Sequence, residues 1–209
     1  LDDGETVTID CTTGTRGRIL SGEVAFEKTK VDLDNLPETK TKVMLNIADP
    51  STALTWWRLP TQGVGLARME FVIENAIGVH PVALARLESM DEQTQTDIRA
   101  RIGEMVGPTY FIENLSQAIA TIAAVHHPNM VLVRMSDFKT SEYANLLGGH
   151  YFEPTETNPM LGFRGASRYI HPDYRDGFEL ECRAVKKARE TIGVENVAVM
   201  IPFCRTIQE

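Results

Sequence analysis

Residues 131–139 read VLVRMSDFK, three apolar residues followed directly by an arginine. An uninterrupted apolar run of this kind is typical of a strand covered on both faces, as in a parallel sheet with helices outside it. A cation at the end of such a strand costs free energy unless an anion meets it. Because parallel α/β folds bind ligands at the carboxyl ends of their strands, Arg134 is predicted to face a ligand.

A second stretch has the same design. Residues 63–71 read GVGLARMEF, a short apolar segment with two glycines that ends in Arg68. Each guanidinium can hold a carboxylate or a phosphate with paired N–H groups, so Arg68 and Arg134 are candidates for binding one small anion together. The alternative is that each arginine forms a structural ion pair, for which Glu70 and Asp137 are available partners.

The order of elements predicts an α/β fold with parallel strands. Residues 42–47 are a strand candidate, and residues 51–59 fit a helix capped by Ser51 or Thr52. The GVGLAR segment follows as the next strand, and strand, helix and strand in this order form a parallel crossover unit.

Later segments extend this pattern. Residues 111–125 form the clearest amphipathic helix, because their apolar residues recur at spacings of four and three. A further helix is predicted over residues 173–192, with Cys182 on its buried face, and a buried strand over residues 196–203. The apolar stripe of the helix at 111–125 is expected to pack on the sheet.

A long polar loop is predicted over residues 138–159, and loops of this length inside a compact fold are often functional. It leads into NPMLGFRGASRY at residues 158–169, where Arg164 and Arg168 share a face if residues 160–170 are helical. The alternative for this pair is ordinary surface charge. The glycines on both sides of Arg164 instead favour a close approach of the backbone at a site.

The chain is expected to contain three parts. Residues 1–27 alternate as a β-hairpin, which cannot bury a core by itself. Residues 28–40 are charged, carry a proline and lack an apolar period, so they are interpreted as a linker. Residues 41–209 carry the strands and helices described above.

Composition excludes several classes of function. The net charge of −8 and the isoelectric point near 5.2 argue against non-specific binding to nucleic acid or to anionic membranes. No run approaches the length of a membrane span.

Cys11, Cys182 and Cys204 lack metal-ligand spacing, which favours reduced thiols and a cytoplasmic location. Cys204 has no histidine nearby in sequence, so a nucleophilic role for it is disfavoured.

Four motifs in fixed order, GVGLARMEF, VLVRMSDFKTSEYANLLGG, NPMLGFRGASRY and VAVMIPFCRT, resemble the phosphoenolpyruvate-utilising enzymes. The resemblance implies that residues 41–209 are the first half of a (β/α)8 TIM barrel that binds pyruvate and phosphoenolpyruvate. It implies that Arg68, Arg134 and Arg164 contact the substrate. Residues 1–27 then correspond to the end of the swivelling phosphohistidine domain.

The residues after Arg134 are most similar to the branch of the family that phosphorylates pyruvate with ATP and water, giving AMP, phosphoenolpyruvate and phosphate through a phosphohistidine. The resemblance implies ATP as co-substrate, Mg²⁺ with ligands after residue 209, and a homodimer. The phosphohistidine and ATP-grasp domains are expected before residue 1, so no catalytic or metal-binding residue is assigned in this chain, and the piece is expected to be inactive alone. Two alternatives stay open: a piece of a pyruvate, phosphate dikinase or phosphotransferase-system enzyme I, and a non-catalytic binding or dimerisation module.

Overall fold

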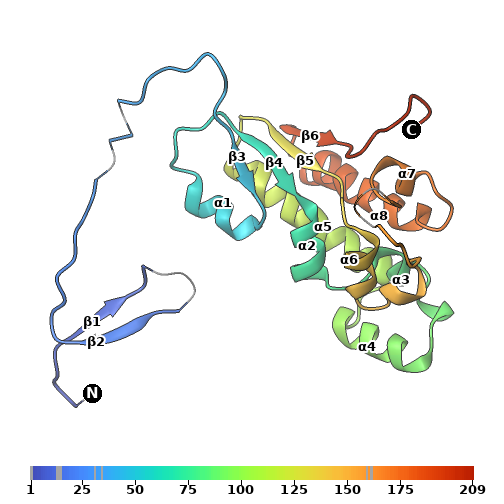
Figure 1. Ribbon diagram of the computed structural model, residues 1–209, viewed down its shortest axis with the longest axis horizontal. Coiled ribbons are helices and arrows are strands. Elements are labelled where there is room, and N and C mark those ends of the chain that lie inside the picture. The colour runs from blue at the N-terminus through green and yellow to red at the C-terminus, as the bar shows by residue number, and fades with distance from the viewer. Residues whose placement is uncertain (1, 13–15, 31, 34, 159, 161) are drawn as a thin grey trace. The chain divides into compact units, whose positions relative to one another are not determined.

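The computed structural model describes residues 2–12, 16–30, 32–33, 35–158, 160 and 162–209. The chain divides into two compact units, Leu1–Glu38 and Thr39–Glu209. In the first unit, strands β1 (Val7–Asp10) and β2 (Arg18–Ser21) pair antiparallel (Figure 1). The hydroxyl of Thr8 donates to the carbonyl of Gly22 at 2.8 Å and so extends this pairing by one residue.

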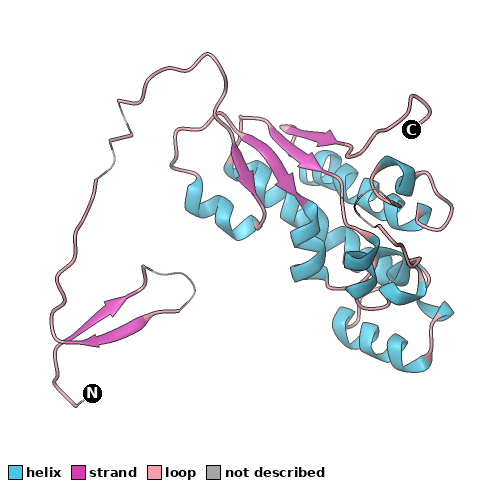
Figure 2. Ribbon diagram, in the orientation of Figure 1, coloured by secondary structure: helices cyan, strands magenta, loops and turns pink. Residues whose placement is uncertain are grey.

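The second unit is built on a four-stranded parallel sheet (Figure 2). Its strands are β3 (Leu45–Ile47), β4 (Val64–Arg68), β5 (Val131–Arg134) and β6 (Val197–Met200), and they lie side by side in sequence order. The predicted α/β class with a parallel sheet is confirmed.

Helical segments connect the strands. Between β3 and β4 lies α1 (Pro50–Trp56), and the connection from β4 to β5 and the one from β5 to β6 are longer. These two connections hold α2 (Met69–Val72), η1 (Ile73–Ile77), α3 (Pro81–Ala85), η2 (Leu87–Ser89), α4 (Glu92–Ile102) and α5 (Gly107–Val125), then α6 (Thr140–Asn145), η3 (Gly149–Tyr151), α7 (Ala166–Tyr169), α8 (Arg175–Lys186) and η4 (Lys187–Ile192).

The two faces of the sheet differ in burial. Ala67 and Val133 are fully buried and belong to the core formed with the helices, whereas Leu66 and Leu132 are only half-buried. Among the described residues, the run at 131–133 is therefore fully covered on one face and partly covered on the other. Side chains alternate along a strand, so Arg68 and Arg134 share the half-open face with Leu66 and Leu132.

Helix α5 is the amphipathic helix that the periodicity of residues 111–125 predicted. Phe111, Leu115, Ile119 and Ile122 are buried in the core, and α5 packs against α1, α8 and β5. The helix starts at Gly107, four residues before the predicted start, with Pro108 in its first turn, where a missing N–H does no harm. In the part of the chain that is described, no helix is long and apolar enough to span a membrane.

Three local predictions were wrong. The carboxylate of Asp49, rather than Ser51 or Thr52, caps α1 by accepting from the Ser51 N–H at 2.8 Å. The predicted loop at 138–159 contains α6 and η3; Pro159 lies outside the described residues. Cys182 is exposed because the buried face of α8 runs through Leu180, Glu181 and Ala184.

Truncating the core face of α5 is expected to destabilise the fold. Ile119→Ala removes buried methyl groups and leaves a cavity, so we expect it to lower the free energy of unfolding by about 2–5 kcal/mol. The control is Gln117→Ala on the exposed side of the same helix, which should change that free energy by less than about 0.5 kcal/mol. Urea unfolding followed by circular dichroism measures both, and equal effects would contradict this assignment of the core.

Candidate functional site

The register of the sheet places the two strand-end arginines side by side. Arg68 of β4 pairs with Arg134 of β5 across the parallel ladder. Both line one pocket with a volume of about 630 Å³, which Arg164 also lines from the segment before α7. The structure therefore brings together the three arginines that the sequence singled out.

Arg68 is the cation of this pocket that has no polar partner among the described residues. Within the described ranges its Nε is buried without a hydrogen bond, and no ion pair there involves its guanidinium. A buried N–H without an acceptor costs free energy comparable to that of a lost hydrogen bond. Arg68 thus keeps a buried N–H donor that no described residue accepts.

Arg134, in contrast, already has two carboxylate partners. Its Nη2 donates to Glu70 Oε1 at 2.7 Å, and its Nη1 lies 3.4 Å from Asp137 Oδ2. The structural ion pair that the sequence left open is therefore present for Arg134, with both of the carboxylates considered. Its Nε, however, is buried and has no partner.

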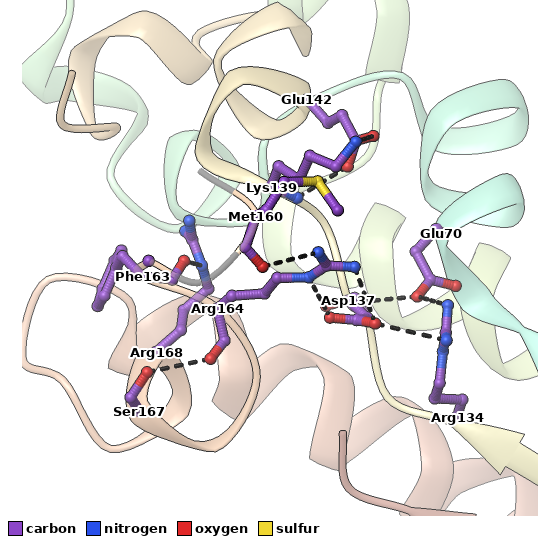
Figure 3. A network of polar contacts seen from close by, with 12 residues as sticks. Glu70, Arg134, Asp137, Lys139, Glu142, Met160, Phe163, Arg164, Ser167 and Arg168 are labelled. Atoms are coloured by element: carbon purple, nitrogen blue, oxygen red, sulfur yellow. Dashed lines mark hydrogen bonds and ion pairs between the residues drawn. The ribbon is translucent and has the colours of Figure 1, made fainter. Parts of the chain in front are cut away.

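Arg164 holds the other side of Asp137 (Figure 3). Its Nε donates to Asp137 Oδ1 at 2.7 Å and its Nη2 donates to Oδ2 at 3.2 Å, the paired geometry that favours guanidinium–carboxylate contacts. The guanidinium also lies 4.6 Å from the centre of the Phe203 ring. Asp137 therefore links Arg134 of β5 to the segment that precedes α7.

The carboxylate of Glu70 is held under the same arginines. Its Oε1 accepts from Arg134 and from the backbone N–H of Asp137 at 2.8 Å, whereas its Oε2 is buried without a partner. Burial raises the pKa of Glu70 despite the nearby Arg134 charge. The site thus contains one carboxylate whose charge is only partly compensated.

The charges that line the pocket balance. Its cations are Arg68, Arg134, Lys139 and Arg164. Its acids are Glu70, Glu74, Asp137 and Glu142, of which Glu142 lies 3.4 Å from Lys139 at the rim. Affinity for an anion must therefore come from the placement of N–H groups that lack acceptors, rather than from net positive charge.

Arg164 and Arg168 do not share a helix face. Gly165, with φ of 63°, precedes α7 and ends the helical conformation there, so Arg164 lies outside the helix. A Cβ at Gly165 would overlap the carbonyl of Pro202, and the Ala166 N–H donates to that carbonyl at 3.1 Å. The close backbone approach expected beside Arg164 is therefore present.

Arg168 is fully buried, so the alternative of ordinary surface charge does not hold for it. Its Nη1 and Nη2 donate to the two oxygens of Glu153 at 2.5 and 2.7 Å, and its Nε donates to the carbonyl of Phe163 at 3.0 Å. The guanidinium lies 4.3 Å from the ring centres of Tyr143 and Phe163. Arg168 thereby holds the backbone one residue before Arg164.

His80 joins the same buried group. Its Nδ1 accepts from the N–H of Val82 at 3.2 Å, and its Nε2 lies 3.0 Å from Glu153 Oε1. The ring proton therefore lies on Nε2 and is donated to Glu153. Burial lowers the pKa of His80, which agrees with a neutral ring.

Sequence reasoning missed Glu153, and no local pattern pointed to it. Its partners Arg168 and His80 lie 15 and 73 residues away, beyond the reach of helix or strand periodicity.

Within the described ranges, no group of three or more His, Cys, Asp or Glu side chains is arranged to hold a metal ion.

Removing Glu153 is expected to destabilise the fold strongly. Glu153→Ala leaves the Arg168 charge buried without a partner, so we expect the free energy of unfolding to fall by about 3–5 kcal/mol. The matched control is Glu88→Ala, which breaks the exposed pair with Arg99 and should leave stability nearly unchanged. Chemical denaturation measures the free energy of unfolding of both variants. A loss of stability in Glu153→Ala as small as in the control would show that the buried pair does not stabilise the fold.

Comparison with known proteins identifies the family of this chain. A family model described as the PEP-binding domain of PEP-utilising enzymes matches residues 25–209. The chain is 45% identical over 210 residues to a phosphoenolpyruvate synthase of Neisseria meningitidis, 47% to one of Pseudomonas aeruginosa and 44% to one of Escherichia coli. Each alignment covers 100% of this chain and 26% of the relative, so the chain spans about a quarter of their length. The chain belongs to the PEP-utilising enzymes, and it matches their PEP-binding domain.

Proposed function

We propose that this chain is the pyruvate- and phosphoenolpyruvate-binding part of a phosphoenolpyruvate synthase (pyruvate, water dikinase). The whole enzyme would convert ATP, pyruvate and water to AMP, phosphoenolpyruvate and phosphate through a phosphohistidine. The observation that carries the proposal is the pairing of Arg68 with Arg134 at the mouth of one pocket. The identity of 44–47% to three synthases supports this branch of the family.

The chemistry of the substrate explains the arginines. Phosphoenolpyruvate carries a carboxylate and a phosphate, and phosphoryl transfer spreads negative charge over the phosphoryl oxygens. Preorganised N–H donors in a site with little water stabilise such charge. Arg68 would supply a guanidinium free of other partners, and Arg134 would supply the Nε that has no acceptor.

Arg164 belongs to the proposed site in a second way. Its guanidinium lines the pocket while it holds Asp137 with two hydrogen bonds. Its reach to a substrate oxygen is limited as long as these bonds persist. We therefore assign Arg164 a substrate contact together with the task of orienting Asp137 beside Arg134.

The architecture supports half of a (β/α)8 barrel. Parallel strands that lie side by side in sequence order, without a reversal, are what a barrel requires. The half-open face that carries Arg68 and Arg134 would line the barrel interior. Residues 1–27 would be the end of the phosphohistidine domain, and the linker at 28–40 would allow it to move.

Other parts of the proposal rest on the resemblance. ATP is the phosphoryl donor and Mg²⁺ the metal of the family, but Glu70 and Asp137 of the described pocket hold arginines and a backbone N–H group. The described acids are not grouped as a metal site. No step is therefore assigned to a metal in this chain. A cytoplasmic location agrees with three free cysteines, and a homodimer is the proposed assembly.

Product analysis of the full-length enzyme tests the reaction. Incubation with ATP and pyruvate alone should give AMP, phosphoenolpyruvate and inorganic phosphate in equal amounts. Dependence on added phosphate with release of pyrophosphate would identify a pyruvate, phosphate dikinase instead. Transfer of the phosphoryl group from phosphoenolpyruvate to a carrier protein would identify an enzyme I, and no turnover would favour a binding module.

Arg68→Ala should weaken phosphoenolpyruvate binding without disturbing an existing ion pair. We expect a loss of about 2–5 kcal/mol, as for other truncated charge pairs, or roughly 30- to 5,000-fold in Kd. Arg134→Ala should lose a similar amount, but it also leaves Glu70 and Asp137 without their partner.

Titration calorimetry of the full-length enzyme measures these affinities. The control is Arg99→Ala, which removes an exposed cation on α4 and should leave Kd unchanged. Wild-type affinity in Arg68→Ala would remove this arginine from the binding site.

A further inference from the structure

Four buried oxygen atoms form a closed ring behind the pocket. Ser136 Oγ lies 2.5 Å from Glu181 Oε1 and 2.5 Å from the hydroxyl of Tyr143. That hydroxyl lies 2.6 Å from the hydroxyl of Tyr174, which lies 3.0 Å from the same Oε1 of Glu181. Glu181 itself is 1% exposed.

The number of protons in this ring can be counted. Four hydrogen-bonded contacts need four hydrogens, and a serine and two tyrosine hydroxyls supply one each. The other hydrogens nearby are used elsewhere: the Ser136 N–H donates to Glu181 Oε2 at 3.0 Å, and the Tyr169 hydroxyl donates to the Ser136 carbonyl. The fourth proton must therefore lie on Glu181.

We propose that Glu181 is a protonated positioning residue, whose carboxylic acid closes the ring and fixes the Ser136 backbone that carries Asp137 into the pocket. The Asp137 N–H donates to Glu70, and the Asp137 carboxylate holds Arg134 and Arg164. A change at Glu181 thus reaches the pocket through two consecutive residues. The link to substrate rests on the function proposed above, whereas the protonation state does not.

The surroundings of Glu181 agree with a neutral acid. Burial, together with the charge of Glu70, raises its pKa to about 7 against the opposing hydrogen bonds from Ser136 and Tyr174. On the packed elements, Glu113 of α5 pairs with Lys187, and Arg168 is neutralised by Glu153. The remaining titratable groups around the ring are Tyr143 of α6, Tyr169 of α7, Tyr174, Cys182 of α8 and His80 at the start of α3.

Ionisation of Glu181 would leave three hydrogens for four contacts. Ser136 and Tyr174 would both donate to the carboxylate, and Tyr143 can donate to Ser136 or to Tyr174 but not to both. One short oxygen–oxygen contact would then lack a hydrogen, and the ring would have to open. Phosphoenolpyruvate affinity is therefore coupled to the proton on Glu181.

Infrared difference spectroscopy tests the proton directly and without substrate. The spectrum of wild type minus Glu181→Gln at pH 6 should contain a carboxylic-acid C=O band, which disappears as the pH rises through about 7. Tyr143→Phe removes two of the four contacts, and the two that remain need no proton from Glu181. In Tyr143→Phe, the Glu181 acid band should therefore disappear at lower pH than in wild type. If desolvation alone set the protonation of Glu181, the band would instead persist to higher pH. Absence of the band at pH 6, or a shift to higher pH in Tyr143→Phe, would overturn the proposal.

The coupling to the pocket is tested by phosphoenolpyruvate affinity in the full-length enzyme between pH 6 and 8.5. Wild-type Kd should rise by about tenfold, within the usual range for coupled sites. The profile should be flatter in Glu181→Gln than in wild type, because an amide has no proton to lose, whereas the contribution of Glu70 is common to both proteins. Glu179→Gln, on the exposed side of α8, should keep the wild-type profile.

Ionisation of phosphoenolpyruvate itself changes Kd equally in wild type and in both variants, so it does not affect the comparison of their profiles. A wild-type profile in folded Glu181→Gln would overturn the positioning role. If wild type bound no phosphoenolpyruvate at any pH, the proposed function would fail, and the infrared measurement would still decide the protonation of Glu181.

Discussion

The parallel register that places Arg68 beside Arg134 is the constraint on which the site depends. Two like charges on neighbouring strands repel one another, and the repulsion grows where little water screens it. Glu70 and Asp137 neutralise Arg134, but the described residues offer no such partner to Arg68. The sheet therefore holds one compensated and one uncompensated guanidinium next to each other, and an anion bound between them would relieve the imbalance.

Asp137 transmits this arrangement to the rest of the unit. Its carboxylate is nearly buried and is satisfied by two arginines from different segments, which offsets the desolvation of the charge. Its backbone follows Ser136, whose N–H and carbonyl are both held by buried side chains, Glu181 and Tyr169. The orientation of the pocket thus derives from α7 and α8, although Arg68 and Arg134 come from β4 and β5.

The local parts of this structure were predictable from sequence, and the long-range parts were not. Strand-end arginines and the face of α5 follow from short apolar periods, so Arg68, Arg134 and Ile119 lie where the pattern indicated. Glu181 has its partner Ser136 45 residues away, and a charged residue on a helix is normally counted as exposed. That rule shifted the predicted buried face of α8 to Cys182, and it also left surface charge open as an alternative for Arg168.

The balanced charges of the pocket bear on how a dianion would enter. Breaking a buried ion pair exposes an uncompensated charge and is expensive, so entry through the contacts of Arg164 with Asp137 would be unfavourable. The guanidinium of Arg68 and the Nε of Arg134 are donors that can be used without breaking any of these pairs. Glu70 lies beneath them with one oxygen unpartnered and its pKa raised by burial, so a bound anion would raise that pKa further. Anion binding and proton uptake would consequently be linked in this pocket, because the same low polarity that strengthens the arginine contacts penalises each additional negative charge.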